Sequence, residues 1–327
     1  MLFARSASSD EAAVSGLAFL RIALVAGCVV SGIGAGPLPA ALIPIPNASF
    51  ESPPFFVIVN LNIDSWQKSP KPDWYVEEGG YEWIQLVGAF RNPAPGEFDR
   101  IDNCNGNQAI WLFAVPEAGV FQDYDTLDWN DPGPTHSFNA NYEPGKAYLL
   151  TVGVLVGTGA GGLMQPGVTL DLNLYYRDAA SNRVAVATTT VTNTTAIFSN
   201  STHLLDFSVN VPTVQAGDPW AGKHIGIEFV STVSSNLQGG YWDLDNVRLQ
   251  EISPPMLAPA APEDGRFQFS LHSEPGLRFE IIAATNLWLP TAAWSSLGLV
   301  TNQSGETFFT DPGTNFGSRF YQARWLP

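Results

Sequence analysis

The sequence of 327 residues is poor in charge and in cysteine, and both scarcities limit what the protein can be. Charged residues make up only 14%, and 31 Asp and Glu outnumber 15 Lys and Arg, which gives a net charge of −16. Nucleic acids and anionic membranes bind clustered basic side chains, so neither is an expected partner. If Cys28 is removed with an export signal, Cys104 is the one remaining cysteine, and no intrachain disulfide can form.

A sustained helical period is missing as well, whereas turn-forming residues are plentiful, with 30 Gly and 25 Pro. Between residues 43 and 253, short apolar or alternating segments are separated by turn residues, a pattern typical of antiparallel strands. The clearest is 168–177, where alternate residues are apolar: Val168, Leu170, Leu172, Leu174 and Tyr176. The other predicted strands include Tyr81–Val87, Gln108–Ala114, Leu149–Val156, Leu205–Val211 and His224–Val230. We therefore predict an all-β chain with an antiparallel β-sandwich over 43–253.

The first 40 residues predict a bacterial export signal. Arg5 and Arg21 precede an apolar run over residues 22–36, and small residues up to Ala40 offer a cleavage site. The run is too short and too rich in Gly for a membrane span. The residues ending at Cys28 resemble a lipoprotein cleavage box, but only six residues separate Arg21 from Cys28, so cleavage beyond Cys28 is favoured. A secreted or cell-surface location follows.

A change of composition after Ile252 predicts a domain boundary. Residues 254–263 are dominated by Pro and Ala and are expected to form an extended linker without sheet pairing. The remaining residues, 264–327, are enough for a small second β-sandwich. Its five predicted strands are Arg266–Leu271, Leu277–Ala283, Trp294–Val300, Glu306–Thr310 and Arg319–Trp325.

The segment Tyr241–Leu249 alternates in a way that suggests a metal site. Alternation places Asp243 and Asp245 on the same face as Val247 and Leu249, and burial of unpaired carboxylates is costly. Near the other end of the domain, 45–51 predicts a short strand that ends in Glu51. If the first and last strands pair, these carboxylates could share a Ca²⁺ ion, which prefers oxygen ligands. The alternative is that Asp243 and Asp245 cap turns or pair with basic side chains.

An acidic excursion between Glu117 and His136 carries four aspartates: Asp123, Asp125, Asp128 and Asp131. A pair of them could serve a glycosidase, a set could bind a second Ca²⁺, or all could be plain surface residues. The four histidines are far apart and lack a metal-binding pattern, and there is no Gly-x-Ser-x-Gly elbow. The sequence therefore assigns no catalytic residue.

Aromatic side chains in polar, loop-like surroundings are the candidates for ligand binding. Sugar rings stack on aromatic faces while neighbouring polar groups bond their hydroxyls. The residues predicted in this role are Trp74, Tyr75, Trp129 and Tyr142, with core packing as the alternative for each. Trp83, Trp111 and Trp242 fall within predicted strands and are expected in the core.

Three segments resemble a known family: Asn47–Glu51 (NASFE), Gly106–Phe113 (GNQAIWLF) and Trp242–Leu249 (WDLDNVRL). They resemble the galactose-binding-like jelly roll of carbohydrate-binding modules and of exported proteins of planctomycete and verrucomicrobial bacteria. The resemblance implies a jelly roll with a structural Ca²⁺ where the first and last strands meet. The resemblance places Glu51 and Asp245, or Asp243, among the ligands of this ion, and the full set of predicted metal ligands is Asn47, Glu51, Asp243 and Asp245. Residues from Leu277 onwards are similar to a small β-sandwich module near the ends of verrucomicrobial exported proteins.

These observations together favour an exported, non-catalytic protein that binds a polysaccharide or other glycan, or serves as a surface scaffold, with structural Ca²⁺. An enzyme acting on polysaccharides through the loop carboxylates is the alternative, and a purely architectural envelope or matrix protein is another. The sequence does not identify the glycan.

Overall fold

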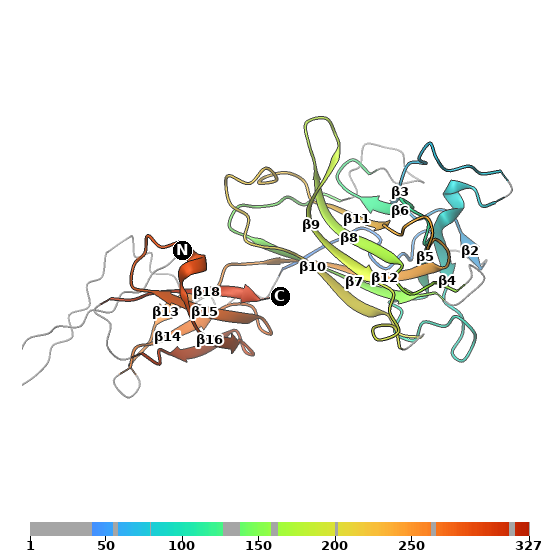
Figure 1. Cartoon of the computed structure of the whole chain (residues 1–327). Helices are drawn as coiled ribbons and strands as arrows, with labels where there is room; N and C mark the ends of the chain where they lie inside the picture. Colours follow the sequence, from blue (N-terminus) through green and yellow to red (C-terminus); the bar gives the residue numbers. More distant parts are fainter. Residues whose placement is uncertain are drawn as a thin grey trace, which may run out of the picture. The chain divides into compact units, whose positions relative to one another are not determined.

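The computed structural model describes residues 41–54, 58–78, 80–126, 138–157, 163–199, 202–262, 266–313 and 318–326. The described residues form antiparallel β-sheets and two short 3-10 helices, so the predicted all-β fold is confirmed (Figure 1). The chain divides at Ile252 into a larger unit, Leu42–Glu251, and a smaller unit that follows it. No helix among the described residues is long and apolar enough to cross a membrane.

The larger unit is a sandwich of two sheets, and its closing strand lies inside one of them. The seven-stranded sheet has the order β10 (Leu205–Val211), β7 (Ala147–Val156), β12 (Tyr241–Ile252), β5 (Gln108–Phe113), β4 (Val87–Arg91), β2 (Val59–Asn60), and β1 (Ala41–Ile43) also pairs with β12. The five-stranded sheet has the order β3 (Gln67–Lys68), β6 (Gly119–Gln122), β11 (Gly226–Ser231), β8 (Thr169–Arg177), β9 (Arg183–Thr192). The first strand therefore pairs with the closing strand as predicted, but it is β1 (Ala41–Ile43) and not the predicted strand over 45–51.

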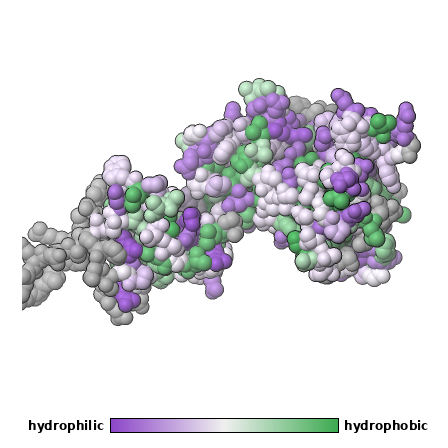
Figure 2. Space-filling model, viewed as in Figure 1, coloured by the Kyte–Doolittle hydropathy of each residue, from purple (hydrophilic) through white to green (hydrophobic). Residues whose placement is uncertain are grey.

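One apolar core fills the space between the two sheets. Leu170, Leu172 and Leu174 of β8 are fully buried, as their alternation predicts. They belong to the same cluster as Val152 of β7 and Trp242 of β12, which come from the facing sheet. Outside the core, Figure 2 shows hydrophilic and hydrophobic residues interspersed on the face in view.

The predicted alternation of the closing strand is wrong in its second half. Asn246 has φ +56°, a left-handed conformation that inserts a bulge-like shift into β12. Trp242 and Leu244 before it and Val247 and Leu249 after it therefore all enter the inter-sheet core. Asp243 and Asp245 consequently face the outer side of the seven-stranded sheet, opposite to those apolar residues.

Two further predicted strands differ in the structure, one replaced by a turn and the other largely by a 3-10 helix. Residues 46–49 form a turn, and the opening strand β1 lies earlier in the chain. Within 81–87, the 3-10 helix η1 (Trp83–Leu86) precedes β4, and the Gln85 side chain accepts a hydrogen bond from the Glu82 N–H (2.8 Å). Trp83 and Leu86, three residues apart, are both buried, which fits the helical period.

The smaller unit contains two three-stranded sheets. One has the order β13 (Met256–Pro259), β14 (Gln268–His272), β17 (Glu306–Thr310), and the other β16 (Ser295–Thr301), β15 (Arg278–Ala284), β18 (Phe320–Leu326). Phe269, Phe279, Ile281 and Tyr321 are central to its core. The prediction that 254–263 cannot pair in a sheet is wrong, because β13 pairs with β14 along its whole length. Its Pro259 lies at the end of an edge strand, where a missing N–H is tolerated.

Candidate functional site

Glu51 and Asp245 bind the same short segment of backbone, although 194 positions separate them in the sequence. Glu51 Oε1 accepts hydrogen bonds from the N–H groups of Asn107 and Gln108, at 2.7 Å each. Asp245 Oδ2 accepts one from the N–H of Asn105 at 2.6 Å. We call Glu51, Asp245 and residues 105–108 the carboxylate junction.

Gly106 makes this close approach possible. Its φ is +104°, a conformation that favours glycine, and a Cβ at this position would lie 2.5 Å from Glu51 Oε1. The residue before Glu51, Phe50, also has a positive φ of +55° and is fully buried. The backbone on both sides of the junction is thus shaped to bring a carboxylate against consecutive N–H groups.

Asp245 is buried in a way that disfavours its charge. Burial, with a smaller contribution from the Glu51 carboxylate, raises the pKa of Asp245 to about 7, although its bond from Asn105 favours the charged form. Asp245 Oδ1 has no hydrogen-bond partner among the described residues. Burial and the adjacent Asp245 also raise the pKa of the Cys104 thiol, which is consistent with an unreactive cysteine.

Asp243 lies two residues before Asp245 on the same side of β12. Burial first, and then the charge of Asp99, raise the pKa of Asp243 well above its usual range, which favours the uncharged form of this carboxyl. Its Oδ1 atom is buried and has no hydrogen-bond partner in the described part of the chain. Both aspartates of the closing strand therefore carry an unsatisfied oxygen, a costly arrangement unless another group neutralises them.

The donor set at the junction fits the predicted Ca²⁺ only in part. Within the described residues no group of three or more His, Cys, Asp or Glu is arranged to hold a metal ion. Glu51 and Asp245 do provide two hard oxygen ligands and an unsatisfied oxygen, so backbone and amide oxygens would have to complete the shell. The Asn47 side chain is already engaged elsewhere, because its amide bonds to the backbone of Ser52 and Asp64 and organises the turn at 46–49.

The predicted ligand-binding aromatics that the structure describes lie in two different environments. Trp74 and Tyr75 lie beside Trp83, with ring centroids 4.9–6.4 Å apart and edge-on packing. Tyr142 is fully buried in the inter-sheet core, so the prediction of a surface ring is wrong for it. Trp129 lies outside the described residues.

Trp74, Tyr75 and Trp83 belong to a longer series of neighbouring rings, which we call the aromatic row. It consists of Trp74, Tyr75, Tyr81, Trp83, Phe113 and Tyr241. Within it, Tyr81 packs on Phe113 at 5.2 Å and Phe113 on Tyr241 at 5.8 Å. The Tyr75 hydroxyl donates to the Tyr81 carbonyl at 2.8 Å. The contacts link three segments of the chain that the sequence does not relate to one another.

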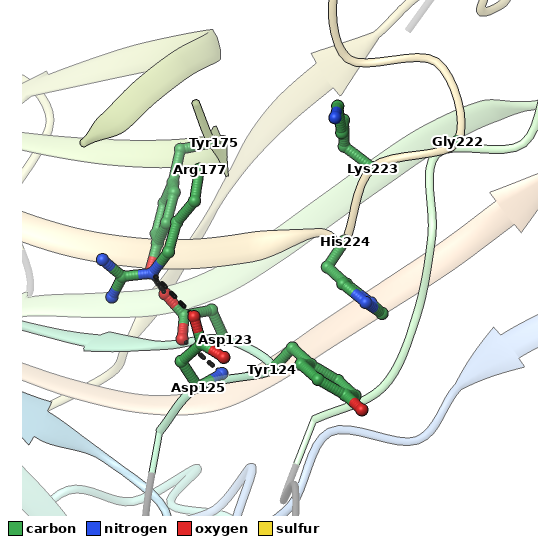
Figure 3. Close-up of a pocket in the computed structure, with 8 residues that line it drawn as sticks. All are labelled: Asp123, Tyr124, Asp125, Tyr175, Arg177, Gly222, Lys223 and His224. Atoms are coloured by element: carbon green, nitrogen blue, oxygen red, sulfur yellow. Dashed lines mark hydrogen bonds and ion pairs between the residues drawn. The ribbon is translucent and has the colours of Figure 1, made fainter. Parts of the chain in front are cut away.

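A cavity of about 350 Å³ opens at one end of the five-stranded sheet (Figure 3). It is lined by Asp123, Tyr124, Asp125, Tyr175, Arg177, Gly222, Lys223 and His224. The rings of Tyr124 and His224 stack at 4.0 Å with an interplanar angle of 8°. The volume is within the range of about 300–1,000 Å³ that is usual for small-molecule sites.

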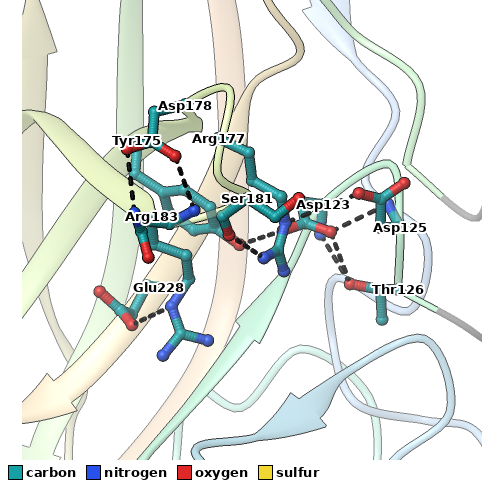
Figure 4. A network of polar contacts seen from close by, with 10 residues as sticks. Asp123, Asp125, Thr126, Tyr175, Arg177, Asp178, Ser181, Arg183 and Glu228 are labelled. Carbon is teal, nitrogen blue, oxygen red and sulfur yellow. Dashed lines mark hydrogen bonds and ion pairs between the residues drawn. The ribbon is translucent and has the colours of Figure 1, made fainter.

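Asp123 connects two of the residues that line this cavity, Tyr175 and Arg177 (Figure 4). Its buried carboxylate accepts hydrogen bonds from the Tyr175 hydroxyl (2.6 Å) and from Arg177 Nε (2.8 Å). Burial, and then the charge of Asp123, raise the pKa of Tyr175, so the tyrosine remains a neutral donor. Asp123 is therefore a structural anchor rather than a solvated member of an acidic loop, while Asp128 and Asp131 lie outside the described residues.

Sequence reasoning missed Arg177, Lys223 and His224. Arg177 ends a clearly predicted strand and looks like an ordinary exposed polar residue there. The one sequence feature that could have pointed to these residues is the low number of Lys and Arg in an acidic chain. Where basic residues are few, several of them close together suggest a binding site for an anion.

Residues 41–250 match the model of a protein family described as HpiC1-like, HpiC1 cyclase, and they make up more than half of the chain. The chain belongs to the HpiC1-like family. The match covers nearly all of the larger unit, which is called the HpiC1-like domain below. No curated protein matches the sequence.

Solved structures that are similar to the chain include a cyclase and carbohydrate-binding modules. A cyclase from Fischerella sp. TAU is 21% identical, with coverage of 65% of this chain and 97% of that chain and a TM-score of 0.47. A cyclase from the same organism is also known in complex with 4-(1H-indol-3-yl)butan-2-one. The tandem CBM22 domains of Paenibacillus barcinonensis Xyn10C are 9% identical, with coverage of 90% and 93% and a TM-score of 0.35.

Proposed function

We propose that the HpiC1-like domain is a non-catalytic, exported carbohydrate-binding domain. The observation that carries the proposal is the exposed part of the aromatic row, where Trp74 is 47% and Tyr81 52% exposed. These two exposed rings belong to one connected aromatic row, and contiguous exposed apolar surface marks interaction sites more than single exposed residues do. Aromatic faces also suit the C–H faces of sugar rings. A surface scaffold without a glycan ligand is the competing outcome.

The ring of Trp74 is held in place before any ligand arrives. Its indole N–H donates to Glu117 Oε1 at 2.8 Å, and it packs edge-on against both Tyr75 and Trp83. A fixed ring loses little conformational entropy on binding, so more of the stacking energy contributes to affinity.

The test is a glycan array followed by titration calorimetry with the best neutral glycan. Trp74→Ala should lower affinity at least about tenfold, as for a central aromatic contact. Trp288→Ala is the matched control, because Trp288 is 92% exposed and belongs to the smaller unit. A complete absence of glycan binding would favour the scaffold, and equal loss in both variants would contradict the assignment of the aromatic row.

We further propose a structural Ca²⁺ at the carboxylate junction, supported by the unsatisfied Asp245 oxygen and the nearby Glu51. The ion would stabilise the folded form because the unfolded chain does not assemble its ligands. Thermal melting with and without EDTA measures this stabilisation. An unchanged midpoint would contradict the proposal.

A second candidate function is acid-catalysed cyclisation, and Asp243 is the observation that favours it. A carboxyl whose pKa is raised by burial can act as a general acid. Asp243 lines neither the cavity in Figure 3 nor the larger groove beside Arg183, which places binding ahead of catalysis. Calorimetry with 4-(1H-indol-3-yl)butan-2-one, for the native chain and Asp243→Asn, tests this candidate. No binding of this ligand by the native chain would count against it.

A further inference from the structure

The outer face of the five-stranded sheet carries an open groove of about 600 Å³ next to the first cavity, and both are lined by Arg177. The groove is lined by Gln67, Phe121, Ser181, Asn182 and Arg183 in addition. Cross-strand neighbours build its floor: Phe121 on β6 pairs with Gln67 on one side and with Glu228 on the other. Strand pairing therefore fixes the floor of the groove.

We propose that this arginine groove binds the carboxylate of an acidic sugar. The inference rests on the proposed carbohydrate-binding function and names the class of glycan. Four of the 15 Lys and Arg of this acidic chain, Lys68, Arg177, Lys223 and Arg183, line the groove or the adjoining cavity. A local gathering of cations is what an anionic ligand requires on a protein with a net charge of −16.

Arg183 is the central residue. Its guanidinium lies over the Phe121 ring at 4.0 Å from the centroid, and its Nε is 3.1 Å from Glu228 Oε1. Glu228 is in turn bonded by Asn173 at 3.0 Å. Among the described residues, neither Nη atom of Arg183 has a partner, so a two-pronged donor remains for a ligand.

Arg177 is held at Nε in a similar way, but one of its Nη atoms already has a partner. Its Nε donates to Asp123 (2.8 Å) and its Nη1 to the Ser181 carbonyl (2.9 Å). Figure 3 shows the Nη atoms pointing away from Asp123. In Figure 4 a carboxylate approaches each of the two arginines at Nε. Carboxylates thus orient both side chains at Nε, and the Ser181 carbonyl uses one outer donor of Arg177, so Arg183 offers the more complete fork.

These donors select for negative charge. Arginine has five N–H donors and no acceptor, and its planar fork matches a carboxylate in a bidentate geometry. Lys68 adds little, because its ammonium already bonds to the carbonyls of Ile84 and Val87. The side chains of Asn182 and Gln67 can serve the hydroxyls of a sugar ring, so a uronic acid meets both requirements of the groove.

The experiment is calorimetry of the full chain with a galacturonic acid trimer and with its methyl ester, the same sugar without the charges. The acid should bind, the ester should bind at least about tenfold more weakly, and added salt should weaken the binding of the acid. Arg183→Gln should lower the affinity for the acid at least about tenfold, and Arg183→Lys should give an intermediate loss because the charge remains but the fork does not.

Arg248→Gln is the matched control, since Arg248 is ion-paired to Asp206 (2.7 Å) on the other sheet and should leave binding unchanged. Thermal melting shows whether each variant is folded. Equal binding of acid and ester, or full affinity in folded Arg183→Gln, overturns the inference. If neutral glycans bind through Trp74 and the acidic trimer does not, the carbohydrate-binding function stands and the inference falls. If no glycan binds, both fall.

Discussion

Replacement of Asp245 by Asn tests the carboxylate junction most directly. The Asp245 side chain is fully buried, and burial raises its pKa from the ordinary 3.8 to about 7. A difference of about three pH units corresponds to roughly 4 kcal/mol between the protonated and charged forms. Asparagine keeps the shape and an oxygen that can accept the Asn105 N–H, but it has no charge to bury.

The direction in which stability changes with pH follows from proton binding. Between about pH 3.8 and about pH 7 the folded state holds the Asp245 proton more tightly than the unfolded state does. Without metal, the stability of the native chain therefore falls as pH rises through this window, and the loss is complete above about pH 7. Asp245→Asn should be more stable than the native chain above this window, by up to roughly 4 kcal/mol, and should lose that advantage towards about pH 4.

Urea unfolding in EDTA and in saturating Ca²⁺ provides the measurement. Calcium should stabilise the native chain and leave Asp245→Asn unaffected. The difference in the free energy of unfolding between the two proteins should therefore become smaller or change sign. Two results would refute the reasoning. One is that Asp245→Asn is destabilised equally at all pH values in EDTA, and the other is that Ca²⁺ stabilises both proteins alike.

Two further substitutions test the backbone and the polar network by the same urea assay. Gly106→Ala should cost at least about 2 kcal/mol, because a positive φ and the contact with Glu51 act together. Gly96→Ala has a similar φ of +86° with open space around it and should cost less. Equal losses of stability in the two variants would contradict a clash between a Cβ at position 106 and Glu51. Asp123→Asn should cost about 2–3 kcal/mol, because Arg177 and Tyr175 lose a buried charged acceptor. Asp206→Asn, in an exposed ion pair, should change stability by less than about 1 kcal/mol, and a larger effect than that of Asp123→Asn would contradict the network.

Strands with strict alternation were predicted well, as β8 and its three buried leucines show. The failures have local causes. Asn246 shifts the phase of β12 through one left-handed residue, which a pattern of apolar and polar letters does not reveal. In the segment 254–263, abundant Pro concealed β13, an edge strand that needs few of its N–H groups.

The candidate sites were predicted to different degrees. Glu51 and Asp245 could be brought together in advance because a sandwich often pairs its first and last strands. That residues 105–108 would lie between these two carboxylates was not predicted. The arginine groove was not predicted at all, since Arg183, Phe121 and Glu228 belong to three different strands and each is unremarkable alone.

The sequence alone determined that this chain is an all-β protein with an acidic surface, because alternation, turn residues and charge are properties of short segments and of composition. Only the tertiary structure decided which side chains meet. Strand order places Arg183 over Phe121, and a single left-handed residue puts Val247 and Leu249 on the face opposite to the two aspartates. Such contacts depend on the register between strands far apart in sequence, and one residue of register exchanges the two faces of a sheet.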